Sequence, residues 1–391
     1  MSVTISEAVK YIGVDDKTID LFESQYVVPH GVSYNSYLIF DEKVALMDTV
    51  DARGMEQWEK NLLAALDGRK VDYLIVSHLE PDHAGSIGRL VELFPEVTLV
   101  GNAKTFQMLP QFFDELPVDE NHKITVAEGE SLSLGTHTLN FYMAPMVHWP
   151  EVMVTYESSE KILFSADGFG KYGALDYEDP EGWACEARRY YFNIVGKYGA
   201  PVQALLKKAS GLDIQTICPL HGPVLKENLG YYIGLYDTWS SYKPEDKGVL
   251  VAYASIHGNT AKAAQKFAEM LRAKGVEKVS VMDLSRDDMA EVVEDAFRYD
   301  RMVLAAASYD GGVFPCMQDF LHHLQSKAFQ NRTVGLIEHG TWGPTAGRTM
   351  KGILETMKNI TIVEPMVTIR STMKESDLPA MEALADVIAN A

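Results

Sequence analysis

The spacing of apolar residues changes near residue 245, and this change limits the possible folds more than any other feature of the chain. Before it, short apolar runs end in polar or glycine-rich loops, a pattern typical of short strands. After it, apolar runs alternate with segments of helical spacing such as Thr260–Lys274 and Met317–Ser326. Such alternation predicts a parallel, doubly wound sheet. Between the two parts, Tyr242–Gly248 is polar, contains Pro and Gly and lacks periodicity, so we predict a linker there.

Two domains are also expected from length, because 391 residues exceed the usual size of one domain. We place them at residues 1–246 and 247–391. The strands predicted in the first are Ser36–Phe40, Val44–Met47, Tyr73–Val76, Val97–Val100, Leu139–Met143, Ile162–Phe164 and Ile214–Ile217, and its helices are Gly54–Leu66, Ala84–Leu93 and Trp183–Leu206. The strands predicted in the second are Val249–Tyr253, Val279–Val281, Met302–Ala306, Val334–Ile337 and Ile360–Val363.

Charge and cysteine content exclude several classes of partner and site. With 35 Lys and Arg against 55 Asp and Glu, the net charge of -20 disfavours nucleic acid and anionic membrane surfaces as partners. No apolar run is long enough to span a membrane, and Met1–Asp16 lacks a leader pattern, so we expect a cytoplasmic protein. Cys185, Cys218 and Cys316 are far apart, which disfavours disulfides, zinc knuckles and cysteine-ligated iron.

The densest group of potential metal ligands directly follows the predicted strand Tyr73–Val76. It places four such side chains within six residues: His78, Glu80, Asp82 and His83. Loops at strand ends are where rigid scaffolds present functional groups. The alternative is an acidic, solvated loop with two incidental histidines. Four candidate ligands at this spacing make that interpretation poorer than a metal site.

Three further candidates follow later strands in the same way: His148, Asp167 and His221. Taken singly, each is more often a structural histidine or a surface aspartate, so the joint arrangement carries the prediction. Seven ligands are too many for one tetrahedral zinc ion. They suit two ions of higher coordination number that share a bridging carboxylate.

Three loops of the second domain predict a cofactor site at one edge of its sheet. The first, Tyr253–Thr260, runs from a strand into a helix, and its backbone amides and hydroxyl groups suit a phosphate. This loop alone is weak evidence for a phosphate site, because most turns of this kind only cap a helix. It contains no GxGxxG or GxxxxGK(S/T) motif, which argues against a dinucleotide or a nucleoside triphosphate. The other two loops, Ala307–Pro315 and Glu338–Pro344, are glycine-rich, and each carries an aromatic side chain that suits a flat ring.

Together the three loops resemble flavodoxin, in which flavin mononucleotide (FMN) binds at the carboxyl ends of the strands. The alternative is a doubly wound domain whose sheet edge binds nothing. The candidate FMN-binding residues are Ser255, His257, Gly258, Asn259, Thr260, Ser308, Tyr309, Asp310, Gly311, Gly312, His339, Gly340, Thr341, Trp342 and Gly343.

Nearly the whole chain resembles the flavodiiron (A-type flavoprotein) family in its minimal two-domain form. The resemblance lies in an HxExDH motif, an isolated histidine, an aspartate in Ser-Ala-Asp-Gly-Phe-Gly and a histidine in Pro-Leu-His-Gly-Pro. It implies an α/β fold in which a metallo-β-lactamase-like αββα sandwich precedes a flavodoxin-like doubly wound parallel sheet. Metallo-β-lactamase hydrolases usually carry HxHxDH, so Glu80 exchanges a nitrogen ligand for an anionic oxygen and favours iron over zinc.

The resemblance also assigns ligands to two non-haem iron ions. It implies that one iron binds His78, Glu80 and His148, that the other binds Asp82, His83 and His221, and that Asp167 bridges them. His30 is either close to the metals, as a donor of a proton or hydrogen bond, or a buried structural histidine. Tyr190 and Tyr191 resemble a family segment near the site, but packing within a helix is the better interpretation of both.

The implied activity is reduction of dioxygen to water, of nitric oxide to nitrous oxide, or of both, with electrons relayed through FMN. Two Fe(II) ions and a reduced flavin hold the four electrons that dioxygen requires. The implied partners are rubredoxin or another small electron donor, and a second copy of the chain in a head-to-tail homodimer or a dimer of dimers. One alternative is a metallo-β-lactamase-type hydrolase with a regulatory flavodoxin-like domain. Another is an electron carrier with a vestigial metal loop. The choice between the two gases and the identity of the donor stay open.

Overall fold

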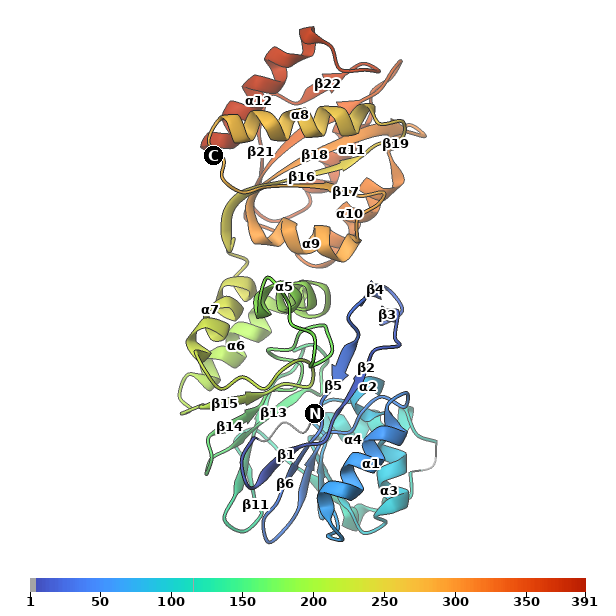
Figure 1. Ribbon diagram of the computed structural model, residues 1–391, viewed down its shortest axis with the longest axis vertical. Coiled ribbons are helices and arrows are strands. Elements are labelled where there is room, and N and C mark those ends of the chain that lie inside the picture. The colour runs from blue at the N-terminus through green and yellow to red at the C-terminus, as the bar shows by residue number, and fades with distance from the viewer. Residues whose placement is uncertain (1–4, 115) are drawn as a thin grey trace. The chain divides into compact units, whose positions relative to one another are not determined.

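The computed structural model describes residues 5–114 and 116–391. The prediction that no leader is present rests partly on residues 1–4, which lie outside this description. The chain divides into two compact units (Figure 1). The first comprises Met1–Tyr191 and Ala200–Tyr236, and the second comprises Phe192–Gly199 and Asp237–Ala391.

Two sheets form the centre of the first unit. One has the strand order β1-β6-β7-β8-β9-β10 and the other the order β11-β12-β13-β14-β15. Their bounds are Val9–Tyr11 (β1), Tyr37–Ile39 (β6), Ala45–Met47 (β7), Tyr73–Ile75 (β8), Thr98–Gly101 (β9), Lys123–Thr125 (β10), Ser131–Ser133 (β11), Thr138–Met143 (β12), Met153–Glu157 (β13), Ile162–Phe164 (β14) and Thr216–Cys218 (β15). Two small pairs, β2 with β5 and β3 with β4, comprise Val14–Asp16, Val32–Tyr34, Leu21–Phe22 and Tyr26–Val27.

The main core of this unit lies between the two sheets. Buried side chains from both meet there, including Ile39 and Ile75 from one sheet and Phe141 and Phe164 from the other. Helices cover the outer faces, and α1 shows why, because its buried residues Trp58, Leu62 and Leu66 recur every fourth position. The helices of this unit are Met55–Leu66 (α1), Pro81–Ala84 (α2), Ile87–Leu93 (α3), Ala103–Met108 (α4), Trp183–Tyr190 (α5), Gly199–Ala209 (α6) and Leu229–Ser240 (α7). The αββα sandwich is therefore confirmed.

The second unit contains a parallel sheet with the strand order β17-β16-β18-β20-β21, with β19 beside β18 and β22 beside β20. In chain order this is 2-1-3-4-5, the order of flavodoxin-like folds. The strands are Asp246–Ala254 (β16), Val279–Asp283 (β17), Tyr299–Tyr309 (β18), Gly312–Val313 (β19), Arg332–His339 (β20), Ile360–Ile362 (β21) and Val367–Ile369 (β22). The predicted flavodoxin-like, doubly wound sheet is confirmed.

Helices cover both faces of this parallel sheet (Figure 1). Phe267 and Leu271 of α8 and Leu384 and Ile388 of α12 join the buried core on one face, together with Val251 of β16. The helices are Asn259–Ala273 (α8), Met289–Arg298 (α9), Pro315–Ser326 (α10), Ala346–Leu354 (α11) and Leu378–Asn390 (α12). Strands buried on both sides explain why β16, β18 and β20 appear in the sequence as continuous apolar runs.

Two predicted elements differ from the structure. The linker prediction is wrong for Asp246–Gly248, because these residues begin strand β16. Asp246 accepts hydrogen bonds there from Lys278 Nζ (2.5 Å) and Arg298 Nε (2.9 Å). These partners neutralise its charge, which allows a polar residue to begin the strand. The predicted helix Trp183–Leu206 is interrupted by a π-helical segment over residues 191–195 and a 3-10 turn over 196–198 before α6 begins.

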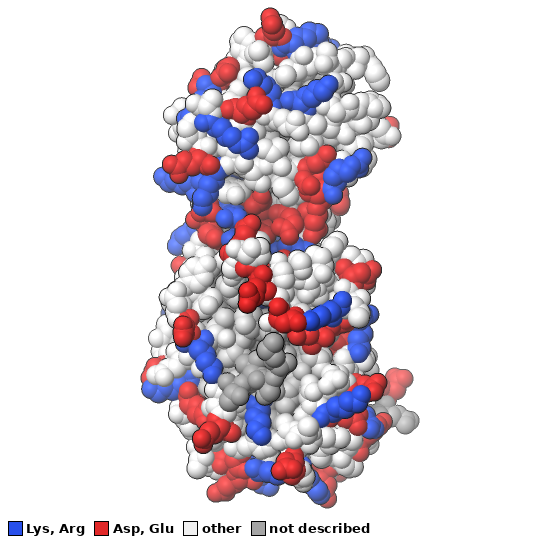
Figure 2. All heavy atoms as spheres, viewed as in Figure 1, with Lys and Arg blue, Asp and Glu red and all other residues white. Residues whose placement is uncertain are grey.

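Acidic and basic side chains are interspersed over the face drawn in Figure 2. Within the described residues, none of the helices is both long enough and apolar enough to cross a membrane.

Candidate metal centre and cofactor loops

The loop after β8 and the short helix α2 position four of the predicted ligands. Asp48 fixes the start of the loop, because its Oδ1 accepts hydrogen bonds from the backbone N–H groups of Ser77 (2.7 Å) and His78 (3.3 Å). Pro81 opens α2, a position that suits its fixed φ and missing N–H. The loop thus carries His78 and Glu80, and the helix carries Asp82 and His83.

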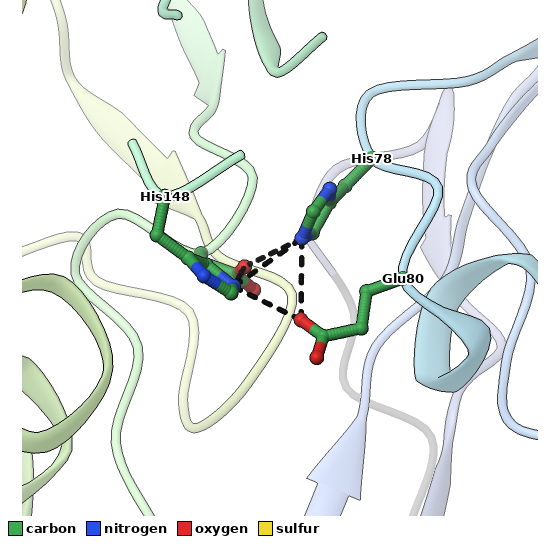
Figure 3. Close-up of side chains that lie close together, drawn as sticks. His78, Glu80 and His148 are labelled. Carbon is green, nitrogen blue, oxygen red and sulfur yellow. Dashed lines mark hydrogen bonds and ion pairs between the residues drawn. The ribbon is translucent and has the colours of Figure 1, made fainter. Parts of the chain in front are cut away.

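One ligand group comprises His78, Glu80, His148 and Asp167 (Figure 3). His148 Nε2 lies 2.9 Å from Glu80 Oε2 and 3.2 Å from Asp167 Oδ2. His78 Nε2 lies 3.3 Å from each of the same two oxygens. Donor atoms around one ion, with bonds of roughly 2.1 Å, lie about 3 Å apart. The spacing therefore fits four donors around a single ion.

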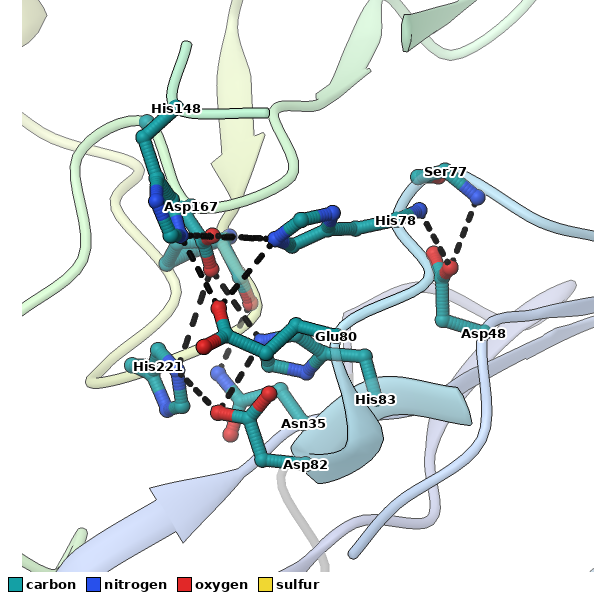
Figure 4. A network of polar contacts seen from close by, with 12 residues as sticks. Asn35, Asp48, Ser77, His78, Glu80, Asp82, His83, His148, Asp167 and His221 are labelled. Carbon is teal, nitrogen blue, oxygen red and sulfur yellow. Dashed lines mark hydrogen bonds and ion pairs between the residues drawn. The ribbon is translucent and has the colours of Figure 1, made fainter. Parts of the chain in front are cut away.

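The second ligand group comprises Asp82, His83 and His221 (Figure 4). Asp82 Oδ2 lies 3.4 Å from His83 Nε2 and 3.2 Å from His221 Nε2. Asp167 also reaches this group, with its Oδ1 3.1 Å from His83 Nε2 and 3.7 Å from His221 Nε2. One oxygen of Asp167 thus faces each group, which is the geometry of a bridging carboxylate.

Residues behind the ligands hold the imidazole rings in place. Glu151 is fully buried, and its Oε1 accepts a hydrogen bond from His78 Nδ1 (2.7 Å). The Ser33 carbonyl accepts one from His221 Nδ1 (2.7 Å). Each contact leaves Nε2 directed toward the ligand groups. Sequence reasoning gave Glu151 no role in the site beyond noting that it is not an expected ligand, and the only signal in the sequence was its position three residues after the predicted ligand His148.

Buried polar atoms without hydrogen bonds show that these residues fit metal ions. Within residues 5–114 and 116–391, Asp82 Oδ1 and Oδ2, Asp167 Oδ2 and His221 Nε2 are buried and lack hydrogen-bond partners. Buried carboxylate oxygens that lack hydrogen bonds are unfavourable unless nearby cations neutralise them or they coordinate a metal ion. Oxygen and imidazole nitrogen donors, with thiolates absent from both groups, suit iron.

The electrostatics of the site favour added positive charge. Burial lowers the pKa of His148, but Asp167 and Glu80 outweigh it and raise this pKa to about 9. Burial raises the pKa of Asp167, but the neighbouring histidines outweigh it and bring this pKa well below its usual range. Asp167 therefore stays ionised beside a protonated His148, and metal binding there would release the proton of His148.

Three aromatic side chains near the predicted site differ in their placement. The exposed His30 ring stacks on Tyr177, with ring centroids 3.7 Å apart, so it is not a buried structural histidine, and a role as a proton or hydrogen-bond donor near the metals stays a prediction. Tyr190 is buried with its ring centroid 5.5 Å from that of His221. Tyr191 is buried against Tyr236. The two tyrosines therefore pack as predicted, and Tyr190 also contacts a candidate ligand.

The three candidate FMN loops follow β16, β18 and β20, which are adjacent and parallel, so all lie at one edge of the sheet. In the first loop, Gly258 caps α8 with φ +84°, and its N–H donates to Ser255 Oγ (3.0 Å). This places Ser255, His257, Asn259 and the buried Thr260 around the N-terminus of a 15-residue helix. A phosphate is stabilised at such a position.

The second and third loops are joined by hydrogen bonds. Asp310 and Gly311 form the tip of the β18–β19 hairpin with positive φ values. Thr345, which directly follows the third loop, donates from its N–H to Ser308 Oγ (2.8 Å) and from its Oγ1 to the Gly312 carbonyl (2.7 Å). Gly340 lies so close to Pro344 that a Cβ atom there would meet backbone at 2.8 Å.

Aromatic side chains of these loops face solvent, as expected of groups that flank a bound ring. Trp342 is 92% exposed and Tyr309 is 44% exposed. His339, in contrast, is buried at the end of β20, and burial lowers its pKa to about 4. In the described part of the chain neither ring nitrogen of His339 has a hydrogen-bond partner. His339 is therefore a buried, neutral imidazole at the start of this loop.

Comparisons with known proteins match both parts of the chain. Residues 32–222 match the ODP family beta lactamase and residues 250–364 match a flavodoxin domain. A nitric oxide reductase of Moorella thermoacetica is 31% identical over 99% of this chain and 98% of its own.

Solved structures extend the likeness to the whole chain. The rubredoxin oxygen:oxidoreductase of Desulfovibrio gigas superimposes with a TM-score of 0.93 at 25% identity, covering 100% of this chain and 98% of that one. The flavodiiron protein of Giardia intestinalis shares the fold, with a TM-score of 0.90 at 24% identity, and the match covers 100% of this chain and 96% of that one. With two matched domains in the same order and relatives aligned from end to end, the chain belongs to the flavodiiron protein family.

Proposed function

We propose that this chain is an oxidoreductase that reduces dioxygen, nitric oxide or both, using a non-haem di-iron site and FMN. The proposal rests on the placement of Asp167: one of its carboxylate oxygens faces each of the two ligand groups. The relatives that support it are named as a nitric oxide reductase and a rubredoxin oxygen:oxidoreductase. We propose His78, Glu80 and His148 as ligands of one iron, and Asp82, His83 and His221 as ligands of the other.

When bound, the two irons supply electrons and open coordination positions for the gas, and FMN replaces the electrons. The chain's own residues position these groups. Glu151 orients His78 through the Nδ1 hydrogen bond, and Ser33 orients His221 in the same way. Burial of His78, His83 and His221 excludes bulk water from the ligand side of the site. Gly258 and Thr260 are proposed to hold the phosphate of FMN.

The hydrolase alternative is not favoured, because the relatives aligned over the whole chain are named as reductases. Glu80 agrees with this, since it supplies a carboxylate where such hydrolases usually carry a histidine.

Partners and domain limits remain proposals. We propose rubredoxin or another small protein as the electron donor, in line with the relative from Desulfovibrio gigas. We also propose a head-to-tail homodimer or a dimer of dimers, with 1–246 as the di-iron domain and 247–391 as the FMN domain. The cytoplasmic location stays a prediction.

The test combines composition with activity. The purified full-length protein is analysed for metals and flavin, reduced without oxygen, and then supplied with dioxygen or nitric oxide in separate experiments. About two irons and one FMN per chain, with consumption of at least one gas, is the expected result. Bound zinc together with hydrolysis of an ester or amide would instead support the alternative.

A further inference from the structure

An apolar cavity of about 250 Å³ lies in the first unit, between helix α6 and the outer face of the β11–β15 sheet. Val202 and Leu206 of α6 line one side, and Leu163 of β14 and Ile217 of β15 line the other. The neighbours of Leu163, Ile162 and Phe164, belong to the core between the two sheets. Because successive strand residues point to opposite faces, the cavity is separate from that core. Well-packed interiors rarely leave a void of this size.

One end of the cavity reaches the loops that carry two proposed metal ligands. Val147, which precedes His148, lines it there, as do Gly168 and Phe169, which follow Asp167. Phe169 is held by Tyr236, whose hydroxyl accepts a hydrogen bond from the Phe169 N–H (2.6 Å) and whose ring stacks on that of Phe169 at 4.3 Å.

Other residues of the lining lie at the surface of the first unit. Lys208, Ser210 and Ile233 are exposed, and Ile233 is 37% exposed, whereas Val147 is 2% exposed and Phe169 is 5% exposed. The same cavity is therefore lined both by solvent-exposed residues and by buried residues next to His148 and Asp167.

We infer that this cavity binds the uncharged diatomic substrate and delivers it to the metal centre, an inference that rests on the proposed function. Dioxygen and nitric oxide are small and weakly polar, so they partition into apolar space that water leaves dry. Two buried hydroxyl groups of the lining already form hydrogen bonds: Ser165 donates to the Gly168 carbonyl (2.6 Å), and Tyr236 accepts from the Phe169 N–H (2.6 Å). The buried part of the lining therefore favours a weakly polar ligand over a charged one.

Xenon gives a test that does not depend on activity, because it occupies apolar cavities of this kind. Crystals of the full-length holoprotein are pressurised with xenon, and its anomalous scattering is located. Xenon beside Leu163 and Val202 is the expected result. An empty cavity under xenon pressure, or an ordered aliphatic molecule that occupies it in the purified protein, would overturn the inference.

Ala209→Phe tests delivery, with Ala204→Phe as the matched control. Ala209 lines the cavity, whereas Ala204 lies in the same helix, is exposed and does not line it. The Ala209→Phe variant is expected to lose the xenon site and to show a several-fold lower kcat/KM for the gas. Its kcat at saturating gas and its metal and FMN contents should stay close to those of the wild type. Val202→Phe, deeper in the cavity, should act in the same direction.

Failure of the inference differs from failure of the proposed function. If Ala209→Phe consumes gas as efficiently as Ala204→Phe and the wild type do, the delivery role is wrong while the reductase assignment stands. If the metal-replete wild type consumes neither gas, the proposed function is wrong, and gas delivery fails with it.

Discussion

At the scale of single residues, Glu151 shows how a side chain that is not a proposed ligand supports the metal centre. Burial raises the pKa of Glu151, but its contact with His78 outweighs burial, so the pKa lies below its usual value. The carboxylate is therefore ionised, and its Oε1 also accepts a hydrogen bond from the Leu79 N–H (2.9 Å). An anion in this position strengthens His78 as a ligand and fixes its ring.

Replacing this charge should weaken metal binding while leaving the fold intact. Glu151→Gln retains an oxygen acceptor but removes the charge, whereas Glu151→Ala removes both. We expect metal affinity to fall about 10- to 100-fold, and further for Glu151→Ala than for Glu151→Gln. Competition with a chelator measures the affinity. Asp213→Asn, at an exposed carboxylate paired with Lys161, is the control. Equal metal affinity in the wild type and Glu151→Ala would contradict the positioning role.

At the scale of elements, the two ends of helix α8 allow the backbone and cofactor roles of glycine to be separated. Gly258 at its start has φ +84° and Gly275 just after its end has φ +86°, and a Cβ atom at either position would meet nothing within 4 Å. Substitution by alanine therefore strains the backbone similarly at both ends, by roughly 1–2 kcal/mol. Only Gly258 belongs to the proposed phosphate site.

We expect Gly258→Ala to weaken FMN binding, while Gly275→Ala retains the affinity of the wild type. Both variants should lose similar stability, measured by chemical denaturation of the flavin-free protein. Titration of each variant with FMN, followed by flavin fluorescence, gives the affinity. A similar loss of FMN affinity in both variants would show that strain in the helix, and not contact with the phosphate, accounts for the effect.

Two turns of the first unit are joined by an ion pair that gives a pH-dependent stability. Asp41 follows β6 and His137 precedes β12, and Asp41 Oδ2 accepts hydrogen bonds from His137 Nδ1 (2.8 Å) and N (2.6 Å). Burial lowers the pKa of His137, but Asp41, Glu157 and Glu160 together outweigh it and raise this pKa above its usual value. A raised histidine pKa stabilises the fold below the unfolded pKa of about 6.5, and this contribution is lost as pH rises through the folded pKa.

The thermal midpoint of the wild type should therefore exceed that of His137→Gln most at about pH 6, and the difference should shrink as pH rises. Thermal unfolding followed by circular dichroism, across a pH series at constant salt, measures it. A difference that grows with pH would contradict the assigned direction.

Much of the fold followed from apolar spacing, and the failures have physical causes. Runs such as Val249–Tyr253 identify strands because both of their sides are buried in a parallel sheet. Asp246 appeared to belong to a linker because its charge is paired only in the folded state, with Lys278 and Arg298. Sequence spacing cannot show such long-range pairing.

The candidate site was predicted from strand ends, because short loops after strands carry His78, Glu80 and Asp167 to one place. Which oxygen of Asp167 faces which group could not be predicted, since it depends on side-chain rotation. The inward turn of Glu151 and the cavity beside Val202 depend on packing between segments far apart in the chain. The assignment of each ligand to a particular iron stays a prediction.

At the scale of the whole molecule, the proposed head-to-tail dimer predicts complementation between variants. Asp167→Asn should lose metal but retain FMN, and Gly258→Ala should do the reverse at low FMN concentration. If one subunit's FMN serves the partner's di-iron site, a heterodimer of the two retains one complete pair. Mixing equal amounts after dissociation should restore about a quarter of the wild-type activity, because half of the dimers are mixed. Two inactive parents that stay inactive after verified subunit exchange would contradict this arrangement.

We propose that the di-iron site and the FMN of this protein act together on a gas. The most direct measurement is the amount of gas consumed in a single turnover by the fully reduced protein, without added donor. Four stored electrons predict about one dioxygen per chain, without release of hydrogen peroxide, or about four nitric oxide molecules converted to nitrous oxide. Consumption of neither gas, or conversion of the dioxygen to hydrogen peroxide, would contradict the account.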